Sequence, residues 1–207
     1  ILEQMACNVH DVELRMAALE TLRKLEGEPD PRTHRRSAAA VKHHALWRQA
    51  HALSMIRRWG GDVRSYRRGD KETLRVRVDK KWTGGDRGLA ELLFVGRVTW
   101  MSMETAPITD AGLQSIQSLV GLERLYLGQT RITGEGLSSL KNLKNLRHLS
   151  LRYLDIQDEA LRQLVHLQQL DSLGLDDTSI TDAGLRHLQH VPRLQSLWLD
   201  RTRITAD

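Results

Sequence analysis

Hydrophobic residues recur with a fixed period of 24 positions from Val98 to the end of the chain. Blocks that begin at Val98, Leu122, Leu146, Leu170 and Leu194 align without insertions. In each block, positions 1, 4 and 6 are apolar, while positions 3, 5 and 7 are polar or variable. This alternation predicts a short strand with one buried face. A fixed period of this length predicts a solenoid of stacked units.

The second half of each block has the pattern of a helix. Position 11 is always isoleucine, and positions 16, 19 and 22 are apolar, which places them on one helical stripe. The residue types that favour an N-cap and an acidic first turn precede three of these helical stripes: Thr109-Asp110, Thr133 and Thr181-Asp182. Position 15 is glycine in three of the four copies that contain it. Because glycine destabilises a helix, its recurrence predicts a close approach of backbone there.

This unit of one strand and one helix resembles the leucine-rich repeat family, in a variant that reads L-x-x-L-x-L-x-x-T-x-I-T-D-x-G-L. The resemblance covers about half of the chain. It implies an α/β fold, a right-handed β–α superhelix with a parallel sheet on its concave face and helices on its convex face. The family's common pattern has asparagine at position 9, where this chain has Thr130, Thr178 and Thr202, but also Ala106 and Leu154. A threonine hydroxyl can take over part of the bonding to the loop backbone, whereas Ala106 and Leu154 cannot.

The region before Val98 predicts further segments. Residues 74–97 match a degenerate first repeat, whose strand is one residue out of step because of an extra residue near Trp82–Gly85. The repeats then cover 74–207 as one degenerate, four full and one truncated copy. Residues 37–73 predict a long helix, ended by Gly60-Gly61, and a hairpin that together cap the solenoid. Residues 28–36 predict a linker and residues 1–27 a helical region, in which 11–22 resembles the second helix of a HEAT-type repeat.

The outward positions of the predicted strands form the candidate binding surface. At position 5, Tyr126 and Trp198 flank Ser150 and Gly174, and they lie about 14 Å apart at the usual strand spacing. Two small residues between two large ones predict a notch that takes an apolar side chain of a partner. The predicted partner-binding residues are Trp100, Arg124, Tyr126, His148, Ser150, Arg152, Gly174, Asp176, Trp198 and Asp200.

Charge changes sign along the predicted sheet. The cationic residues Arg124, Arg147 and Arg152 come first, and the acidic residues follow: Asp171, Asp176, Asp177 and Asp200. One interpretation is that these charges fix the direction of a bound peptide. The alternative is that Arg152 and Asp176 pair with each other across adjacent strands.

Leucine-rich repeat proteins commonly bind protein partners on the concave sheet. The resemblance therefore implies a non-catalytic protein-interaction module, and we expect no enzyme activity, cofactor or metal. Repeats with I-T-D-x-G-L loops also look like those of ubiquitin-ligase substrate receptors. The alternative is therefore the recognition or regulatory region of a larger enzyme, such as a ubiquitin ligase or a multidomain signalling enzyme, whose catalytic part lies outside this chain.

Charge and composition add a third, weaker possibility. Residues 30–81 hold 15 Lys/Arg and five Asp/Glu, a net charge of +10 against +5 for the whole chain. Such a region can bind nucleic acid, although a solvated helix face and a charged turn explain it more simply. The single cysteine, Cys7, fits a reducing compartment and favours the cytoplasm, and no apolar run is long enough to span a membrane. The chain begins at Ile1 and ends within a repeat, which predicts a fragment of a longer protein.

Other candidate motifs have simpler explanations. Arg68-Gly69-Asp70 is an integrin-type tripeptide, but Gly-Asp in a short hairpin is ordinary turn chemistry. His43, His44 and His51 share the long predicted helix without a cysteine or acid to complete a metal site. No phosphate-binding loop or nucleophile motif occurs.

Overall fold

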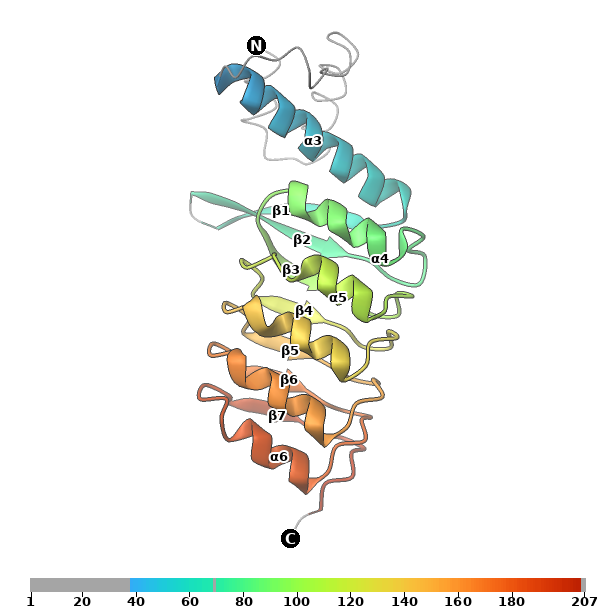
Figure 1. Ribbon diagram of the computed structural model, residues 1–207, viewed down its shortest axis with the longest axis vertical. Helices are drawn as coiled ribbons and strands as arrows, with labels where there is room; N and C mark the ends of the chain where they lie inside the picture. Colours follow the sequence, from blue (N-terminus) through green and yellow to red (C-terminus); the bar gives the residue numbers. More distant parts are fainter. Residues whose placement is uncertain (1–37, 69, 206–207) are drawn as a thin grey trace.

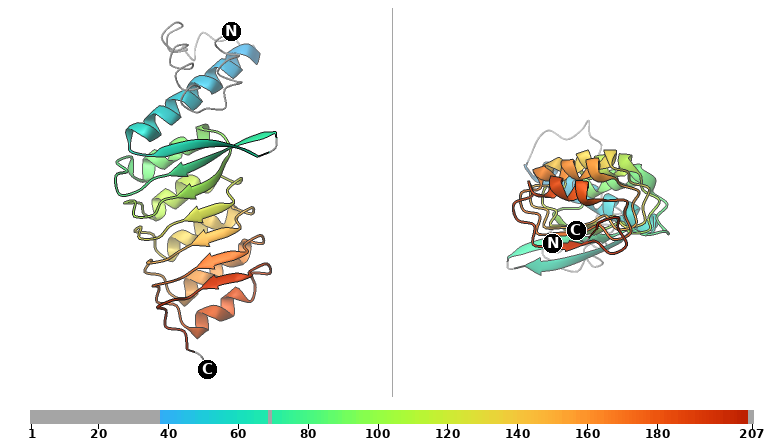
Figure 2. Two further views of the ribbon diagram at one scale, coloured as in Figure 1. Left: turned by 180° about the vertical axis from the view of Figure 1, so that it is seen from behind. Right: turned by 90° about the horizontal axis from the view of Figure 1, so that it is seen from below.

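The computed structural model describes residues 38–68 and 70–205, with the side chains of 45–67 and 70–205. The HEAT-like segment 1–27, the linker 28–36, Cys7 and Gly69 lie outside the described residues, as do the side chains of His43 and His44. Figure 1 shows the elements stacked along one long axis. Figure 2 shows two layers, with the sheet on one side and the helices on the other.

The first layer is a seven-stranded sheet whose strand order follows the sequence. The strands β1 and β2 form an antiparallel hairpin, and β2 to β7 are parallel. In the repeats, each strand pairs with the residues 24 positions later, as the period predicts. The strands are β1 (Asp62–Arg68), β2 (Lys71–Arg77), β3 (Val98–Ser102), β4 (Arg124–Tyr126), β5 (His148–Ser150), β6 (Ser172–Gly174) and β7 (Ser196–Trp198).

The second layer consists of short helices, and two of the four that follow β3 to β6 are 3₁₀ rather than α. A spacing of three residues between apolar positions suits the three-residue turn of a 3₁₀ helix, so all three side chains stay on the core side. The helices are α4 (Gly85–Gly88), η1 (Leu89–Phe94), α5 (Asp110–Ile116), η2 (Glu135–Asn142), η3 (Asp158–His166) and α6 (Asp182–Leu188).

The core between the layers is continuous from the first described helix to the last strand. The apolar residues at positions 1, 4, 6, 11, 16 and 19 of the full repeats line it, and most are fully buried. Leu194, Leu197 and Leu199 of the last block are only partly buried. The architecture is thus the α/β solenoid that the leucine-rich pattern predicts.

The helix α3 (Ala38–Arg58) lies across the β1 end of the stack and packs on η1 and β1 (Figure 1). Its residues Ala52, Leu53 and Ile56 join the core. Gly60 has φ of +87°, and its N–H donates to the Arg57 carbonyl, while the Gly61 N–H donates to the Ile56 carbonyl. These two bonds form a Schellman cap, so the positive φ expected at the Gly-Gly pair is confirmed.

The strand β2 is one residue out of step with the later repeats, as its sequence indicates. Leu74 pairs with Val98, but Arg75 pairs with Trp100, so the register shifts by one between Leu74 and Arg75. The shift places Arg75 and Arg77 on the outward side, beside Trp100 and Ser102.

A ladder of aspartates links successive repeats on the helix side. The Asp110 carboxylate accepts hydrogen bonds from the Thr133 N–H at 2.8 Å and from its hydroxyl at 2.7 Å. The same pair of bonds joins each aspartate at position 13 to the threonine 23 residues later: Asp86 to Thr109, Asp158 to Thr181, and Asp182 to Thr205. Thr109 and Thr181 also cap α5 and α6 as expected, whereas Thr133 does not cap η2, whose N-cap is Gly134.

The ladder explains the recurring glycine at position 15. A Cβ on Gly112 would lie 2.7 Å from Asp86 Oδ1, and Gly136 and Gly184 face the carboxylates of Asp110 and Asp158 in the same way. The close approach predicted from the sequence is therefore made by side chains rather than by backbone: the carboxylate of the ladder and, at Gly112 and Gly184, also the isoleucine at position 11.

One rung of the ladder is missing, and three substitutions accompany the gap. Position 13 of the second block is Gly134, and the following block has Gln157 instead of threonine and Ala160 instead of glycine. A Cβ on Gly134 would lie 2.9 Å from the Ala160 Cβ. In the three rungs for which all three positions lie in the chain, acid, threonine and glycine occur together, and at Gly134 all three are replaced together.

Restoring this rung should stabilise the chain. In a variant that combines Gly134→Asp, Gln157→Thr and Ala160→Gly, we expect two new hydrogen bonds to a carboxylate, which stabilise by about 1–3 kcal/mol before the helix cost of the new glycine. Gly134→Asp alone is the control and should destabilise, because its side chain meets Ala160. Chemical denaturation measures both, and a stabilised single variant would contradict the coupling.

Candidate functional site: the open face of the sheet

The side of the sheet opposite to the helices is an exposed surface, which we call the open face. Its side chains form two columns across β2–β7, fixed by the strand register. The first column is Arg75, Trp100, Arg124, His148, Ser172 and Ser196. The second is Arg77, Ser102, Tyr126, Ser150, Gly174 and Trp198.

The predicted notch lies on the open face between β4 and β7. It is a hollow of about 270 Å³, between Tyr126 on one side and Trp198 on the other, with Ser150 and Gly174 between them. The remaining lining residues are Glu104, His148, Leu149, Arg152 and Ser172. The large–small–small–large sequence of position 5 thus produces a cavity in the structure.

Aromatic rings form the two ends of the notch. Trp198 is one of the most exposed large hydrophobic side chains, at 45%. At the other end, the rings of Trp100 and Tyr126 lie 5.5 Å apart and tilted by 45°. Trp100 therefore supports Tyr126 from the side away from the hollow.

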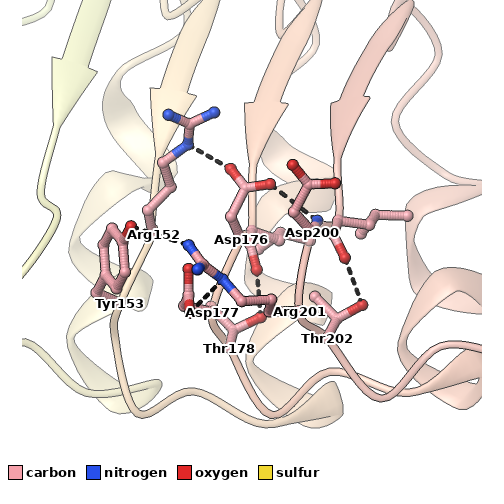
Figure 3. Close-up of polar contacts among 10 residues, drawn as sticks. Arg152, Tyr153, Asp176, Asp177, Thr178, Asp200, Arg201 and Thr202 are labelled. Atoms are coloured by element: carbon pink, nitrogen blue, oxygen red, sulfur yellow. Dashed lines mark hydrogen bonds and ion pairs between the residues drawn. The ribbon is translucent and has the colours of Figure 1, made fainter.

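Arg152, at the side of the notch, forms an ion pair with Asp176, which confirms the alternative that these two residues pair across adjacent strands (Figure 3). The Asp176 side chain is 8% exposed, and its Oδ1 accepts a hydrogen bond of 2.9 Å from the Asp200 N–H. The Arg152 guanidinium also lies 5.9 Å from the centre of the Trp198 ring. The pair is half-buried, so it holds the arginine along the side of the hollow.

Other acids of this end are also paired. Arg201 Nε lies 2.9 Å from Asp177 Oδ1, and its Nη2 lies 3.4 Å from the Tyr153 hydroxyl (Figure 3). His148 Nδ1 lies 3.5 Å from Asp171 Oδ1. Asp176 and Asp177, two of the four acids at this end of the predicted charge gradient, are therefore neutralised by arginines of the chain.

The notch contains a buried hydroxyl that has no partner. Ser150 is 8% exposed, and its Oγ makes no hydrogen bond among the described residues. It lies 3.5 Å from the position that a Cβ on Gly174 would take. A buried unsatisfied hydroxyl costs about 1–3 kcal/mol, so the packing of this region leaves Ser150 at a local cost in stability.

His148 lies at the edge of the notch and is partly buried. Burial lowers the pKa of His148 below its usual value, Asp171 opposes this shift, and the cations Arg124 and Arg147 add to it. The neutral imidazole is thereby favoured in the folded state.

This shift gives the stability a pH dependence. Because the folded-state pKa is below the unfolded one, the contribution of His148 is complete above about pH 6.5 and is lost as the pH falls through the folded-state pKa. We expect His148→Gln to flatten the fall in melting temperature below that pH. An identical pH profile for the variant and the wild type would contradict the assignment.

The turns at the ends of the strands share an unusual backbone. Thr105, Gln129, Tyr153, Asp177 and Arg201, all at position 8, have φ between +54° and +65°. The N–H groups of the first four donate to the carbonyl at position 7 of the next repeat, which extends the parallel ladder and holds the left-handed conformation. At position 9, the hydroxyls of Thr130, Thr178 and Thr202 donate to the carbonyl three residues earlier, as expected of threonine there.

The structure brings together six of the predicted site residues in the notch: Tyr126, His148, Ser150, Arg152, Gly174 and Trp198. Asp176 and Asp200 support it through Arg152, and Arg124 lies beside His148 on the neighbouring strand. Glu104 and Ser172 also line the notch but were not among the predicted residues. Trp100 belongs to a second pocket, with the arginines of β1 and β2, which the sequence did not identify.

Among the side chains that the structure describes, those of 45–67 and 70–205, no group of three or more His, Cys, Asp or Glu is placed to hold a metal ion. In the same part of the chain, no helix has the length and apolar character needed to cross a membrane.

The chain is similar in structure to leucine-rich repeat proteins. It aligns with an internalin, InlF, of Listeria monocytogenes at 24% identity and a TM-score of 0.42, over 57% of this chain and 38% of the internalin. It aligns with the leucine-rich repeat ectodomain of the receptor kinase SOBIR1 of Arabidopsis thaliana at 17% identity and a TM-score of 0.47, over 77% of this chain and 97% of the ectodomain. The chain thus spans well under half of the internalin. No protein-family model and no curated protein matches the sequence. At these identities and TM-scores, neither structure bears on the function of this chain.

Proposed function

We propose that this leucine-rich-repeat solenoid is a non-catalytic protein-interaction module that binds an extended segment of a protein partner on its open face. The notch between Tyr126 and Trp198 is the observation that supports this function. At about 270 Å³ it falls below the roughly 300–1,000 Å³ of small-molecule sites, so it suits a side chain of a larger partner.

The composition of the notch fits a protein-binding hot spot. Trp, Tyr and Arg dominate such spots, and here Trp198, Tyr126 and Arg152 surround two small residues. The partner would place an apolar side chain over Gly174, between the rings of Tyr126 and Trp198. The same face would serve equally well if the chain is the recognition region of a larger enzyme.

Blocking the notch tests this proposal. A peptide that binds the chain is first selected from a displayed random library, and its Kd is then measured for the wild type and for Gly174→Arg. We expect the Kd to rise at least about thirtyfold, which corresponds to a hot spot of about 2 kcal/mol. Trp198→Ala, which removes one end of the notch without touching the core, should weaken binding in the same direction.

The matched control is Gln114→Arg, which adds the same side chain to the exposed surface of α5. It should leave the Kd unchanged. If Gly174→Arg and Gln114→Arg bound the selected peptides equally well, the proposed function of the notch would be wrong.

A further inference from the structure

The open face continues beyond the notch onto the β1–β2 hairpin, where it becomes strongly cationic. A pocket of about 180 Å³ lies there. We call it the arginine pocket, and its lining residues are Asp62, Arg64, Tyr66, Arg75, Arg77 and Trp100. It lies on the same face as the notch, because Arg75 pairs with Trp100 and Trp100 pairs with Arg124 in the strand register.

The arginine pocket holds more positive charge than the chain itself balances. Arg64 and Arg75 are directly opposite each other in the antiparallel hairpin, an arrangement of like charges that destabilises a sheet. Asp62 Oδ2 lies 2.8 Å from Arg64 Nε and balances one of the three guanidinium groups. Asp62 is also opposite Arg77 in the register, but its ion pair is with Arg64, and Arg77 makes no ion pair among the described residues.

The excess charge extends over several strands. Arg124 on β4 pairs in register with Trp100 and likewise has no carboxylate partner in the described part of the chain. From β1 to β4 there are three strand spacings, which is about 14 Å. A single phosphate or carboxylate cannot reach all these arginines, whereas several acidic side chains on one extended segment can.

The aromatic rings of this region argue against stacked nucleic-acid bases. The Arg75 guanidinium lies 4.1 Å from the centre of the Tyr66 ring, and Trp100 lies against Tyr126. Bases of a single strand bind by stacking on open aromatic faces. Here the aromatic groups already contact each other or a guanidinium, which favours a protein segment over nucleic acid.

We propose that the arginine pocket, together with Arg124, binds a run of Asp and Glu side chains in the partner segment whose apolar side chain enters the notch. This inference rests on the proposed function and adds the chemistry and the direction of the partner. The acidic end lies over β1–β4 and the apolar residue over β5–β7. Carboxylates suit guanidinium groups through bidentate hydrogen bonds, and charge complementarity fixes the register of binding.

The test uses the full chain and a synthetic Glu-rich peptide that carries one Phe after its acidic run. The comparison peptide has every Glu replaced by Gln. We expect the Glu peptide to bind at least about tenfold more tightly than the Gln peptide, and its affinity to fall as salt rises from about 50 to 300 mM. The double variant Arg75→Gln/Arg77→Gln should abolish this difference.

The matched control is Lys141→Gln/Arg186→Gln, which removes the same two charges from exposed positions on η2 and α6. It should keep the preference for the Glu peptide. Circular dichroism melting of all variants confirms that they fold, because both arginines point away from the core.

Other outcomes separate this inference from the proposed function. If the Glu and Gln peptides bound equally and both bound Gly174→Arg more weakly, the proposed function of the notch would be supported. The inference that the partner segment is acidic would then be wrong. If a phosphoserine peptide or a single-stranded oligouridine bound more tightly than the Glu peptide, in a manner that depends on Arg75 and Arg77, the choice of a carboxylate segment would be overturned.

Discussion

Leu149→Ala should destabilise the whole solenoid by about 2–5 kcal/mol. Leu149 is at position 4 of the third block, is 2% exposed, and lies on β5 between Leu125 of β4 and Leu173 of β6. Truncation removes apolar burial and leaves a cavity that the flanking leucines, fixed by their own strands, cannot fill. Urea denaturation followed by circular dichroism measures the loss.

The control for this prediction is a truncation at an outward position of the array. Gln168→Ala, at an exposed position after η3, should change stability by less than about 0.5 kcal/mol. An unchanged denaturation curve for Leu149→Ala would contradict the assignment of position 4 to the core. The assignment of the open face, which depends on it, would then also be wrong.

Gly136→Ala should destabilise by about 2–4 kcal/mol, although alanine is the better helix former. The φ of Gly136 is not positive, so alanine is allowed by the backbone, but its Cβ would clash with the Asp110 carboxylate. The clash adds overpacking to the loss of the two bonds to Thr133. Helix propensity alone predicts the opposite sign.

A second substitution tests the cause of this effect. Adding Asp110→Gly and Thr133→Gln to Gly136→Ala reproduces the combination found at Gly134, Gln157 and Ala160, so the triple variant should recover part of the lost stability. Equilibrium unfolding of the variants gives a coupling energy between these positions. If the substitutions acted additively, with no recovery, the aspartate ladder would not explain the glycine.

The repeat core could be read from the sequence because it depends on periodicity alone. Positions 4 and 6 must face inwards if alternate residues of a strand face opposite sides, and the strand register then follows from the period. The notch could be predicted for the same reason, because its four central residues occupy one column: Tyr126, Ser150, Gly174 and Trp198. The pairing of Arg152 with Asp176 was anticipated only as an alternative, because strand spacing cannot decide between an internal ion pair and a contact with a partner.

Three other features of the structure have a weak signal in the sequence or none: the positive φ at position 8, the aspartate ladder and the arginine pocket. The residues at position 8 are Thr, Gln, Tyr, Asp and Arg, and without Gly or Asn nothing indicates a positive φ. The sequence pattern assigns Asp110 and Asp182 to the first turn of a helix, although the joint replacement of aspartate, threonine and glycine at Gly134, Gln157 and Ala160 is visible in the sequence. The arginine pocket depends on the register shift at Leu74 and Arg75 and on an antiparallel partner, neither of which has the period of the repeats.

The central claim, that the open face binds a peptide at the notch, is tested most directly by the indole N–H signals of the five tryptophans. Trp198 and Trp100 lie on the open face, whereas Trp82 is buried and donates its indole N–H to the Gly85 carbonyl. We predict that titration of a ¹⁵N-labelled chain with a selected peptide shifts the Trp198 signal most, shifts Trp100 when the peptide is acidic, and leaves Trp82 unchanged. A saturable shift of the Trp82 signal with Trp198 unmoved would contradict the account.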